Sequence, residues 1–292
     1  MTAQVTAVIV SYQVRRHLVR CLRSVLRSSE RPAIVVVDNA SADGSAEMVE
    51  KEFPSVRLIR NQANLGFAAA SNLGIKASDT PYVLSLNPDT EVTLSAIGIL
   101  REFLDTNRLV GAVGPRIIRP DGSLDFAARR SFPTPATAFA RLSNLSRIFP
   151  TSSRFGRYNL TYRSPDETQE IDSGTGACLM LRRQALDQVG LFDEAFFMYG
   201  EDLDLCFRLK QGGWKIIYLP AAEVLHYKGQ SSRQVSYRMI REFHRSMLIF
   251  FNKHYRSTTP WPVAQLVAAG VAGRCATLLA VNAVRRRKRV SR

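Results

Sequence analysis

The chain has 292 residues, 46% of them hydrophobic and 22% charged, so it can bury a full core, and wholesale disorder is excluded. Its four cysteines lie far apart and form no CxxC pair, which argues against a zinc site and a disulfide framework. The net charge of +15 indicates an anionic partner. Because no nucleic-acid-binding motif accompanies this charge, we expect an anionic membrane surface as the partner and no nucleic acid.

Short apolar runs alternate with helical patterns along the chain. Residues 5–11 and 33–37 are β-branched runs typical of buried parallel strands, and residues 14–28 between them have apolar side chains at helical spacing. This order predicts a right-handed strand–helix–strand unit. Further strands are expected at 56–60, 82–86, 109–114, 173–182 and 215–219, and helices from about 46, at 68–76, 94–104 and 237–254. The predicted fold class is α/β, with a mixed, mainly parallel sheet flanked by helices.

Two aspartates stand where predicted strands end. Asp38 closes the second strand, and Asp89 follows the fourth in the turn Asn87-Pro88-Asp89. Ligands of open α/β sheets bind at the carboxyl ends of the strands, and a carboxylate there suits a hard divalent cation that carries phosphates. Both aspartates also have structural interpretations, because an aspartate after a strand commonly forms an Asx-turn or caps the next helix.

A cluster of acids lies within an apolar stretch at residues 196–208, which reads FFMYGEDLDLCFR. Aromatic and aliphatic neighbours disfavour the charged form of a carboxyl group and raise its pKa toward the range useful for proton transfer. Glu201, Asp202 and Asp204 are therefore candidate catalytic groups. The other interpretation is a helix N-terminus whose first-turn acids complement the helix dipole. The stretch alone does not distinguish the two.

A lone histidine, His226, precedes a polar segment that reads YKGQSS. A single histidine is most often a buried polar group whose hydrogen bonds are satisfied within the core. Here it stands beside Lys228, a glycine and the hydroxyls of Ser231 and Ser232. An amine and hydroxyls on a flexible segment suit the binding of a diphosphate.

Seven segments taken together resemble a known family. They are VIVSY at 8–12, VVDNASADGS at 36–45, NQANLGFAAASN at 61–72, LNPD at 86–89, SGTGACLMLRR at 173–183, GLFDEAFFMYGEDLDLCFR at 190–208 and HYKGQSS at 226–232. In this order and spacing the chain resembles the inverting glycosyltransferases of family two, which have the GT-A fold, and within them the rhamnosyltransferase-like group. It departs from the family's usual pattern at Gln13, where asparagine is usual, and at Asn87, the first position of the Asp-x-Asp motif.

The resemblance implies a site for a nucleotide sugar. Its residues would be Ser11, Tyr12, Asp38, Asn64, Gly66, Asn87, Asp89, Lys228, Ser231 and Ser232. The first three would hold the base, the next two would line the nucleotide pocket, and the residue at 87 would lie near the ribose. The last three would belong to a loop that closes over the phosphates.

The resemblance also implies the catalytic machinery. Asp89 and His226 would bind Mg²⁺ or Mn²⁺, which neutralises the leaving diphosphate. Asp202 would be the general base, with Glu201 in support and Asp204 in a structural role. In an inverting transfer the acceptor hydroxyl attacks the anomeric carbon opposite the leaving group, so the reaction needs a base on one face and a cation on the other.

The predicted function is that of an enzyme, a metal-dependent inverting glycosyltransferase of the hexosyltransferase class. We expect it to move a sugar from a nucleotide sugar, with dTDP-rhamnose as the expected donor, to a hydroxyl of a cell-surface glycan or of a polyprenyl-diphosphate-linked acceptor. The alternatives are another donor, such as UDP-GlcNAc or UDP-galactose, and a sugar-nucleotide-binding protein without catalytic activity. A Rossmann dehydrogenase is excluded because no G-x-G-x-x-G follows the first strand.

Two regions stand outside the sheet pattern. Residues 126–165 contain seven arginines and no acid. We expect 120–170 to form an acceptor-side insertion over the mouth of the active site, and a surface loop is the alternative. Residues 1–255 would make up the glycosyltransferase domain. Residues 256–292, with eight basic residues and no acid, would form a basic, apolar helical tail that associates with the membrane.

The expected localisation rests on this C-terminal tail. Its apolar segment at 261–284 is long enough to cross a bilayer, but an arginine near its middle, Arg274, costs about 2.5–3.5 kcal/mol on insertion. Packing on the domain, lying on the membrane and insertion all stay open. Because no basic stretch or cleavage site precedes the first strand, we expect a cytoplasmic protein, held peripherally on the inner face of the cell membrane by the RRRKR cluster at 285–289.

Overall fold

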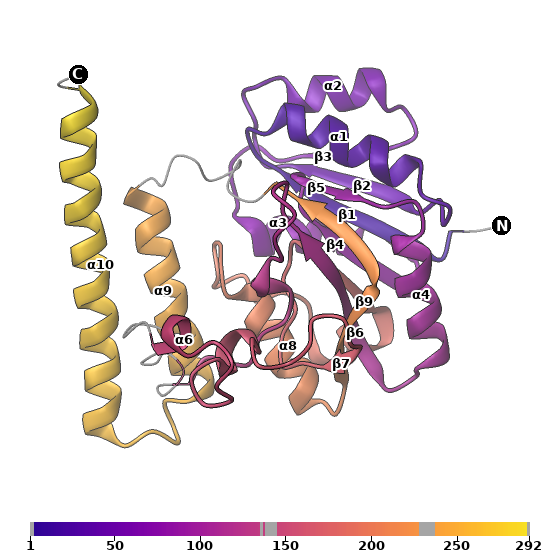
Figure 1. The fold of residues 1–292 in the computed structure, drawn as a ribbon. Helices are drawn as coiled ribbons and strands as arrows, with labels where there is room; N and C mark the ends of the chain where they lie inside the picture. The colour runs from indigo at the N-terminus through magenta and orange to yellow at the C-terminus, as the bar shows by residue number, and fades with distance from the viewer. Residues whose placement is uncertain (1–2, 135–136, 138–144, 228–236, 291–292) are drawn as a thin grey trace.

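The structure of the protein is a computed structural model that describes residues 3–134, 137, 145–227 and 237–290, with side chains described as far as residue 284. One sheet forms the centre of the molecule (Figure 1). Its strands are β1 (Val5–Ser11), β2 (Ala33–Asp38), β3 (Arg57–Arg60), β4 (Tyr82–Leu86), β5 (Thr90–Val92), β6 (Val110–Ile118), β7 (Gln169–Glu170), β8 (Cys178–Arg182) and β9 (Lys215–His226).

The strand order is β3-β2-β1-β4-β8-β6-β9-β5, and β7 pairs with β9 outside this path. The parallel pairs and the two antiparallel pairings of β8 set β3, β2, β1, β4, β6 and β9 in one direction. Strands β8, β7 and β5 run the other way. The predicted mixed, mainly parallel sheet is therefore confirmed.

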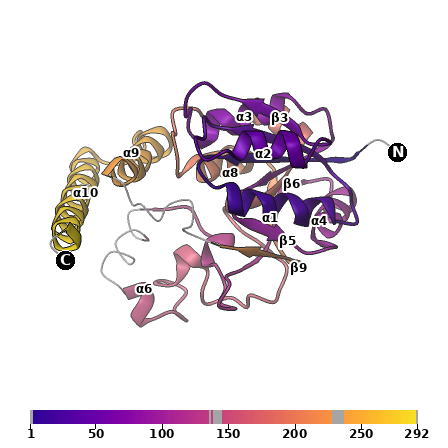
Figure 2. The same cartoon turned by 90° about the horizontal axis from the view of Figure 1, so that it is seen from above.

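Most of the described helices flank this sheet, and the last two extend away from it (Figure 2). The described helices are α1 (Arg15–Leu26), α2 (Ser45–Glu52), α3 (Phe67–Lys76), α4 (Ala96–Thr106), α6 (Leu145–Ile148), α7 (Arg183–Val189), α8 (Glu201–Gln211), α9 (Tyr237–His254) and α10 (Trp261–Val290), with short 3₁₀ turns at Phe126–Ala128 and Arg157–Asn159. Helix α3 contacts β1 and β2, whereas α4 packs on β6 and β9. Every residue of β1 is buried. This agrees with its apolar, β-branched sequence, which is typical of a strand that is covered on both faces.

The structure corrects the predicted end of the last strand. We expected the strand from 215 to stop at Pro220, but β9 continues to His226. A bulge makes this possible: Leu219 pairs with Pro115 of β6, and the next pair joins Glu223 to Arg116. The proline thus lies where the ladder is interrupted and no backbone N–H is needed. The extension brings His226 opposite Thr90 of β5.

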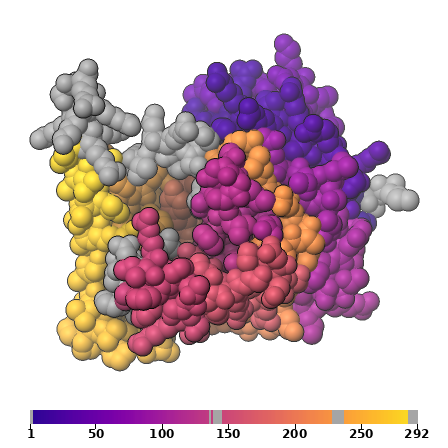
Figure 3. All heavy atoms as spheres, in the orientation of Figure 1, coloured from indigo at the N-terminus to yellow at the C-terminus, as the bar shows by residue number. Residues whose placement is uncertain are grey.

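The glycine-rich segment before β8 differs from its prediction as well. Residues 173–177 were expected to belong to the strand, but β8 begins at Cys178. Ser173 instead forms an isolated bridge with Arg130, in which each backbone N–H donates to the carbonyl of the other residue at 3.0 Å. This bridge ties the arginine-rich segment to the edge of the sheet. The described part of that segment spreads over the front of the molecule (Figure 3).

The departure from the family pattern at residue 13 has a structural consequence. Gln13 is exposed and has a φ of 57°, in the left-handed region where asparagine is favoured over longer side chains. We therefore expect Gln13→Asn to raise the free energy of unfolding by about 0.5–1 kcal/mol. Urea unfolding at neutral pH measures it. Gln13→Ala is the control, and an equal gain from alanine would contradict the backbone explanation.

The chain ends in a pair of helices that projects from the domain. Helices α9 and α10 lie side by side, and α10 is on the far side of α9 from the sheet (Figure 2). The predicted helix at 237–254 is confirmed with the same bounds. In the arginine-rich segment the structure describes the short helix α6, and residues 138–144 before it lie outside the described residues.

Candidate active site

Two polar side chains lie at the carboxyl ends of the first two strands. Ser11 and Asp38 are register partners on β1 and β2, and both are buried. One oxygen of Asp38, Oδ2, accepts a hydrogen bond from the Ser41 backbone N–H at 2.9 Å, so this half of the carboxylate serves the turn after β2. Its other oxygen, Oδ1, and the Ser11 hydroxyl are buried without a hydrogen-bond partner among the described residues. Buried polar atoms are usually paired, so these two are available to a ligand, and Tyr12 beside them is exposed.

The turn at Asn64 and Gly66 is built on a network of asparagines. The Asn64 side-chain oxygen accepts from the Gly66 backbone N–H at 3.0 Å and from Asn39 Nδ2 at 2.9 Å. Gly66 lies against the 196–208 stretch, because a Cβ there would come within 2.3 Å of the Phe197 carbonyl oxygen. Asn39 was not predicted as a site residue. Its place directly after Asp38 at a strand end was the signal that sequence reasoning missed.

The predicted metal ligands lie close together. The antiparallel pairing of β5 and β9 places His226 Nε2 at 3.3 Å from Asp89 Oδ1, and both side chains are buried. The other ring nitrogen, Nδ1, is 3.6 Å from Oδ2 of Asp125. Burial alone would lower the pKa of His226, but the interactions with Asp125 and Asp89 outweigh it and raise that pKa. Asn87 begins the turn that carries Asp89: its carbonyl accepts from the Thr90 N–H at 3.2 Å, and its backbone N–H donates to the Ala177 carbonyl at 3.0 Å.

Asp125 was not predicted as a site residue. It is buried, it follows β6, and its Oδ1 accepts hydrogen bonds from the Ala127 N–H and from Arg119. A histidine that binds a metal through one ring nitrogen usually has a carboxylate or carbonyl at the other. Asp89, His226 and Asp125 have this arrangement, since the two carboxylates lie at opposite nitrogens of the ring. A carboxylate oxygen and an imidazole nitrogen are ligands that a divalent cation accepts.

No group of three or more histidine, cysteine, aspartate or glutamate side chains suited to a metal ion occurs within the described ranges. Two protein ligands are nevertheless sufficient for a cation that also binds substrate phosphates and water. Asp89 and His226 therefore fit such a cation.

The predicted base, Asp202, is held by three donors. Its Oδ2 accepts from Arg130 Nη2 at 2.7 Å and from the Gly176 N–H at 3.2 Å. Its Oδ1 accepts from the Leu203 N–H at 2.8 Å. Arg130 and Asp202 are each 11% exposed at the side chain. Sequence reasoning missed Arg130, because it was one of seven arginines in an insertion and nothing local marked it out.

A short segment before β8 joins the two halves of the site. Asp202 accepts from Gly176, as described above, and the next residue, Ala177, accepts from the Asn87 N–H at 3.0 Å and from the Thr90 hydroxyl at 3.3 Å. The acid of α8 and the turn that carries Asp89 thus contact consecutive residues of one backbone. The structure brings the predicted base and the predicted metal ligands to the same edge of the sheet.

Glu201 lies next to the base and is buried, and its Oε2 has no hydrogen-bond partner among the described residues. Burial, and after it the negative charge of Asp202, raises the pKa of Glu201 from 4.5 to about 8. The two residues before it, Tyr199 and Gly200, both have positive φ, so the chain turns sharply into α8 at this point. Glu201 thus keeps its proton near neutral pH and can donate a hydrogen bond.

This raised pKa predicts a pH dependence of stability. Between pH 4.5 and about 8 the unfolded chain has lost the proton of Glu201 while the folded chain retains it, so stability falls as the pH rises through this window. We expect Glu201→Gln to remove the loss, with equal stability near pH 4.5 and a variant more stable by about 4 kcal/mol at pH 8. Urea unfolding at several pH values measures it, with the exposed Glu52→Gln as the control. A difference that does not change with pH would contradict it.

Asp204, the third acid of the stretch, is fully buried in ion pairs. It lies 2.8 Å from Arg208 Nε, 2.8 Å from Lys253 Nζ and 2.7 Å from His254 Nε2. The last two partners belong to α9, so Asp204 fixes that helix on α8. This environment leaves it no room for a substrate.

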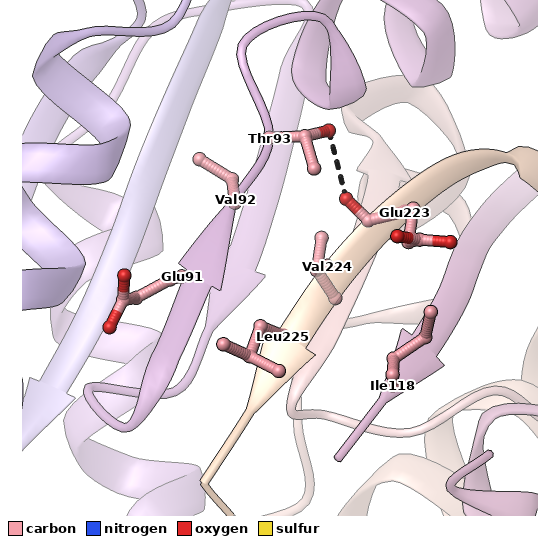
Figure 4. A pocket seen from close by; sticks show the side chains of 7 residues that line it. All are labelled: Glu91, Val92, Thr93, Ile118, Glu223, Val224 and Leu225. Atoms are coloured by element: carbon pink, nitrogen blue, oxygen red, sulfur yellow. Dashed lines mark hydrogen bonds between the residues drawn. The ribbon is translucent and has the colours of Figure 1, made fainter. Parts of the chain in front are cut away.

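Lys228, Ser231 and Ser232 fall outside the described residues. A hollow of about 320 Å³ beside β5 and β9 is lined by Glu91, Val92, Thr93, Ile118, Glu223, Val224 and Leu225, and contains none of the predicted site residues (Figure 4). Within it the Thr93 hydroxyl donates to the Glu223 carbonyl at 3.0 Å.

Comparison with known proteins identifies the family. Residues 6–190 match the family model described as Glycosyl transferase family 2, and residues 141–288 match that of Glycosyl transferase family group 2. The chain is 34% identical over 262 residues to the N-acetylglucosaminyl-diphospho-decaprenol L-rhamnosyltransferase of Mycobacterium tuberculosis, covering 86% of this chain and 84% of the relative. It is 23% identical to the rhamnosyltransferase WbbL of Escherichia coli K12, covering 77% of this chain and 84% of that protein.

Solved structures show the same fold. The mannosyltransferase PcManGT of Pyrobaculum calidifontis, solved with GDP-Man and Mn²⁺, superposes with a TM-score of 0.59 at 16% identity, covering 96% of this chain and 79% of that one. S. aureus TarS 1–349 superposes with a TM-score of 0.58 at 14% identity, covering 93% and 71%. The architecture is that of GT-A glycosyltransferases, as the sequence motifs predicted. The chain belongs to glycosyl transferase family 2 and is a glycosyltransferase.

Proposed function

We propose that the protein transfers a rhamnosyl group from dTDP-rhamnose to a sugar hydroxyl of a polyprenyl-diphosphate-linked acceptor, with inversion at the anomeric carbon. One observation carries the proposal: Asp202 and the turn that carries Asp89 are bound to consecutive backbone residues, Gly176 and Ala177, and His226 lies 3.3 Å from Asp89. A base and a cation that flank one reacting carbon require such proximity. The mycobacterial relative supports the sugar and the acceptor, because its name specifies an L-rhamnosyl group and a diphospho-decaprenol acceptor.

A divalent cation, Mg²⁺ or Mn²⁺, is part of this proposal. Asp89 and His226 Nε2 would hold it, and Asp125 at the other ring nitrogen would keep Nε2 turned toward it. When bound, the cation neutralises charge on the departing diphosphate. The Mn²⁺ in the mannosyltransferase of the same fold supports this assignment.

In the proposed reaction the chain's own groups position the substrates and move one proton. Asp38 Oδ1 and the Ser11 hydroxyl, both buried and unpartnered within the described residues, would bind the base of the nucleotide. Asp202 would take the proton of the acceptor hydroxyl as the new bond from that oxygen to the anomeric carbon forms and the bond to the diphosphate breaks. Glu201, neutral near pH 7, would donate a hydrogen bond within the same pocket.

The experiment is a donor screen followed by transfer. The purified protein with Mn²⁺ is heated with dTDP-rhamnose, UDP-GlcNAc, UDP-galactose and GDP-mannose, and the stabilising donors are then incubated with a synthetic polyprenyl-diphosphate N-acetylglucosamine. We expect dTDP-rhamnose to raise the melting temperature most and to give a product one deoxyhexose heavier. Transfer from another donor would replace the rhamnose assignment. Binding without transfer from any donor would favour a non-catalytic sugar-nucleotide-binding protein.

A further inference from the structure

The last helix, α10, has one face against α9 and one face unpartnered. Between 261 and 284 the residues with little exposure recur at helical spacing, among them Ala264, Val271 and Arg274. Only 6% of the most apolar 18-residue window in this stretch is buried, although its mean hydropathy is 1.6. Leu266 on the outward face is 72% exposed, and Val284 is 56% exposed. Twenty-four residues of helix make an apolar surface about 36 Å long.

The one charged side chain of this stretch is turned toward α9. Arg274 Nη1 lies 3.0 Å from Nε2 of the buried His244, and its guanidinium lies over the Phe243 ring. The His244 Nδ1 is 2.7 Å from the Ile240 carbonyl, so Nδ1 carries the proton and donates it there, and Nε2 accepts from the arginine. Because Arg274 is paired with α9, the outward face of residues 261–284 carries no charged side chain.

We propose that α10 lies in the plane of an anionic membrane, with its outward face in the boundary between headgroups and acyl chains and with α9 on the protein side. The charge supports a bilayer as the occupant, because residues 256–292 hold eight basic residues and no acid, five of them in the RRRKR cluster at the helix end. A second copy of so basic a surface would be repelled.

The packing of α9 is the reason why α10 lies in the membrane and does not span it. Helix α9, which packs on α10, exposes Arg241 and Arg245, and it is fixed to the catalytic domain through Asp204 and His254 at 2.7 Å. A spanning α10 would carry these arginines into the hydrocarbon or would break the contact between Arg274 and His244. Either outcome costs several kcal/mol.

Flotation with vesicles tests the membrane surface. The full chain is mixed with vesicles of phosphatidylcholine alone or with equal phosphatidylglycerol, and the floated fraction is measured. We expect binding to the anionic vesicles and a drop of about tenfold for Leu266→Glu with Val281→Glu, because Val281 is also exposed, at 41%. Leu94→Glu with Leu109→Glu is the matched control, because these leucines of the catalytic domain are 66% and 69% exposed. Equal flotation of both variants would overturn the proposal.

Two further measurements separate the alternatives. Alkaline carbonate should release the bound protein, as it does proteins that lie on a membrane, and retention would show a spanning helix and overturn the in-plane arrangement. Light scattering after size exclusion should give a monomer in the absence of vesicles. A dimer that the α10 variant abolishes, together with no flotation of the wild type, would assign the outward face to a second copy.

A separate observation concerns the base. Arg130 reaches Asp202 from the bridge with Ser173, and its Nη2 also contacts the Gly174 carbonyl, so its guanidinium is fixed from two sides. Burial alone would lower the pKa of Arg130, but the charge of Asp202 outweighs it and raises that pKa, so the arginine stays charged. The arginine-rich segment thus supplies a partner for the predicted base.

We infer that Arg130 is a positioning residue, which holds the Asp202 carboxylate in one orientation at the mouth of the site; the inference rests on the proposed function. Removing the guanidinium leaves Oδ2 with the Gly176 N–H alone among these donors, so the carboxylate can rotate away from the acceptor hydroxyl. Small displacements of a catalytic group cost large factors in rate. The loss should therefore appear in kcat and leave the binding of both substrates unchanged.

Steady-state kinetics of Arg130→Lys and Arg130→Met test this inference. We expect kcat to fall about 10²-fold in the methionine variant and less in the lysine variant, with KM for donor and acceptor within about twofold of the wild type. A raised KM for the acceptor with an unchanged kcat would assign Arg130 to acceptor binding and overturn the inference. If the methionine variant does not fold, the lysine variant provides the test. An undiminished kcat with a raised acceptor KM in that variant would likewise overturn the inference. A wild type without transfer would refute the proposed function instead.

Discussion

Asp202→Asn is expected to lower kcat by about 10²–10⁴-fold, because an amide cannot take the proton of the acceptor hydroxyl. The change keeps the shape of the side chain, and its oxygen can still accept from Arg130 Nη2 or from the Gly176 N–H. The donor site at Asp38 and Asp89 belongs to other elements, so nucleotide-sugar binding should persist. Radiolabelled transfer and the donor-induced shift in melting temperature measure the two quantities.

A second variant distinguishes the catalytic role of Asp202 from the structural role of the neighbouring acid Asp204. Asp204→Asn is the informative companion, because Asp204 is fully buried in ion pairs with α8 and α9. We expect it to lower the melting temperature, by the loss of buried charge pairing, and to reduce kcat far less than the change at Asp202. If the Asp202 variant lost donor binding while it stayed folded, the base assignment would be wrong.

Asp89→Ala is expected to abolish the dependence of nucleotide-sugar binding on Mn²⁺ and to weaken that binding in its presence. Asp89 is one of the two side chains that would hold the cation, and His226 Nε2 lies 3.3 Å from it. Asp125→Asn should have a smaller effect of about 10–100-fold on metal affinity, because it alters the orientation of His226 and leaves both ligands in place. Titration of Mn²⁺ by electron paramagnetic resonance, with the nucleotide diphosphate present, measures metal binding without turnover.

The assignment of Asp89 as a metal ligand and of Asp125 as its support predicts a graded series of Mn²⁺ affinities. The wild type should bind most tightly, Asp125→Asn less tightly and Asp89→Ala least, whereas the exposed control Asp79→Asn should leave the titration unchanged. Identical Mn²⁺ binding in the wild type and the Asp89 variant would remove the ligand assignment. Identical binding in the wild type and the Asp125 variant would show that Asp125 serves only to cap the turn at residues 126–128.

Local patterns in the chain were sufficient for most of the elements and for the edge of the sheet where the site lies, but not for β5 and β7 or for the bounds of β8 and β9. Buried apolar runs predicted β1, β2 and β4, since a strand covered on both faces has to be apolar along its whole length. Polar residues at the ends of these strands pointed to Asp38 and Asp89, because the carboxyl ends of parallel strands meet at one edge. The motifs then predicted the family, which the relatives confirm.

The partners of those residues come from contacts between segments far apart in the chain, which periodicity does not encode. Arg130 meets Asp202 because a backbone bridge joins the insertion to Ser173. Asp125 meets His226 because β6 and β9 are neighbours, and because a bulge at Pro220 lets β9 continue past the proline. Strand order depends on how the crossovers pack, so no pattern within either segment reveals these pairs.

In the C-terminal tail, too, the sequence determined some features and the tertiary structure decided others. Its composition established an apolar helix with one central arginine and a basic end. The direction in which Arg274 points depends on the helix packed beside it, and His244 of α9 supplies the acceptor that draws the arginine inward. A helical pattern specifies which residues share a face, but the neighbour selects the face that is buried. For α10 that selection leaves the uncharged face outward.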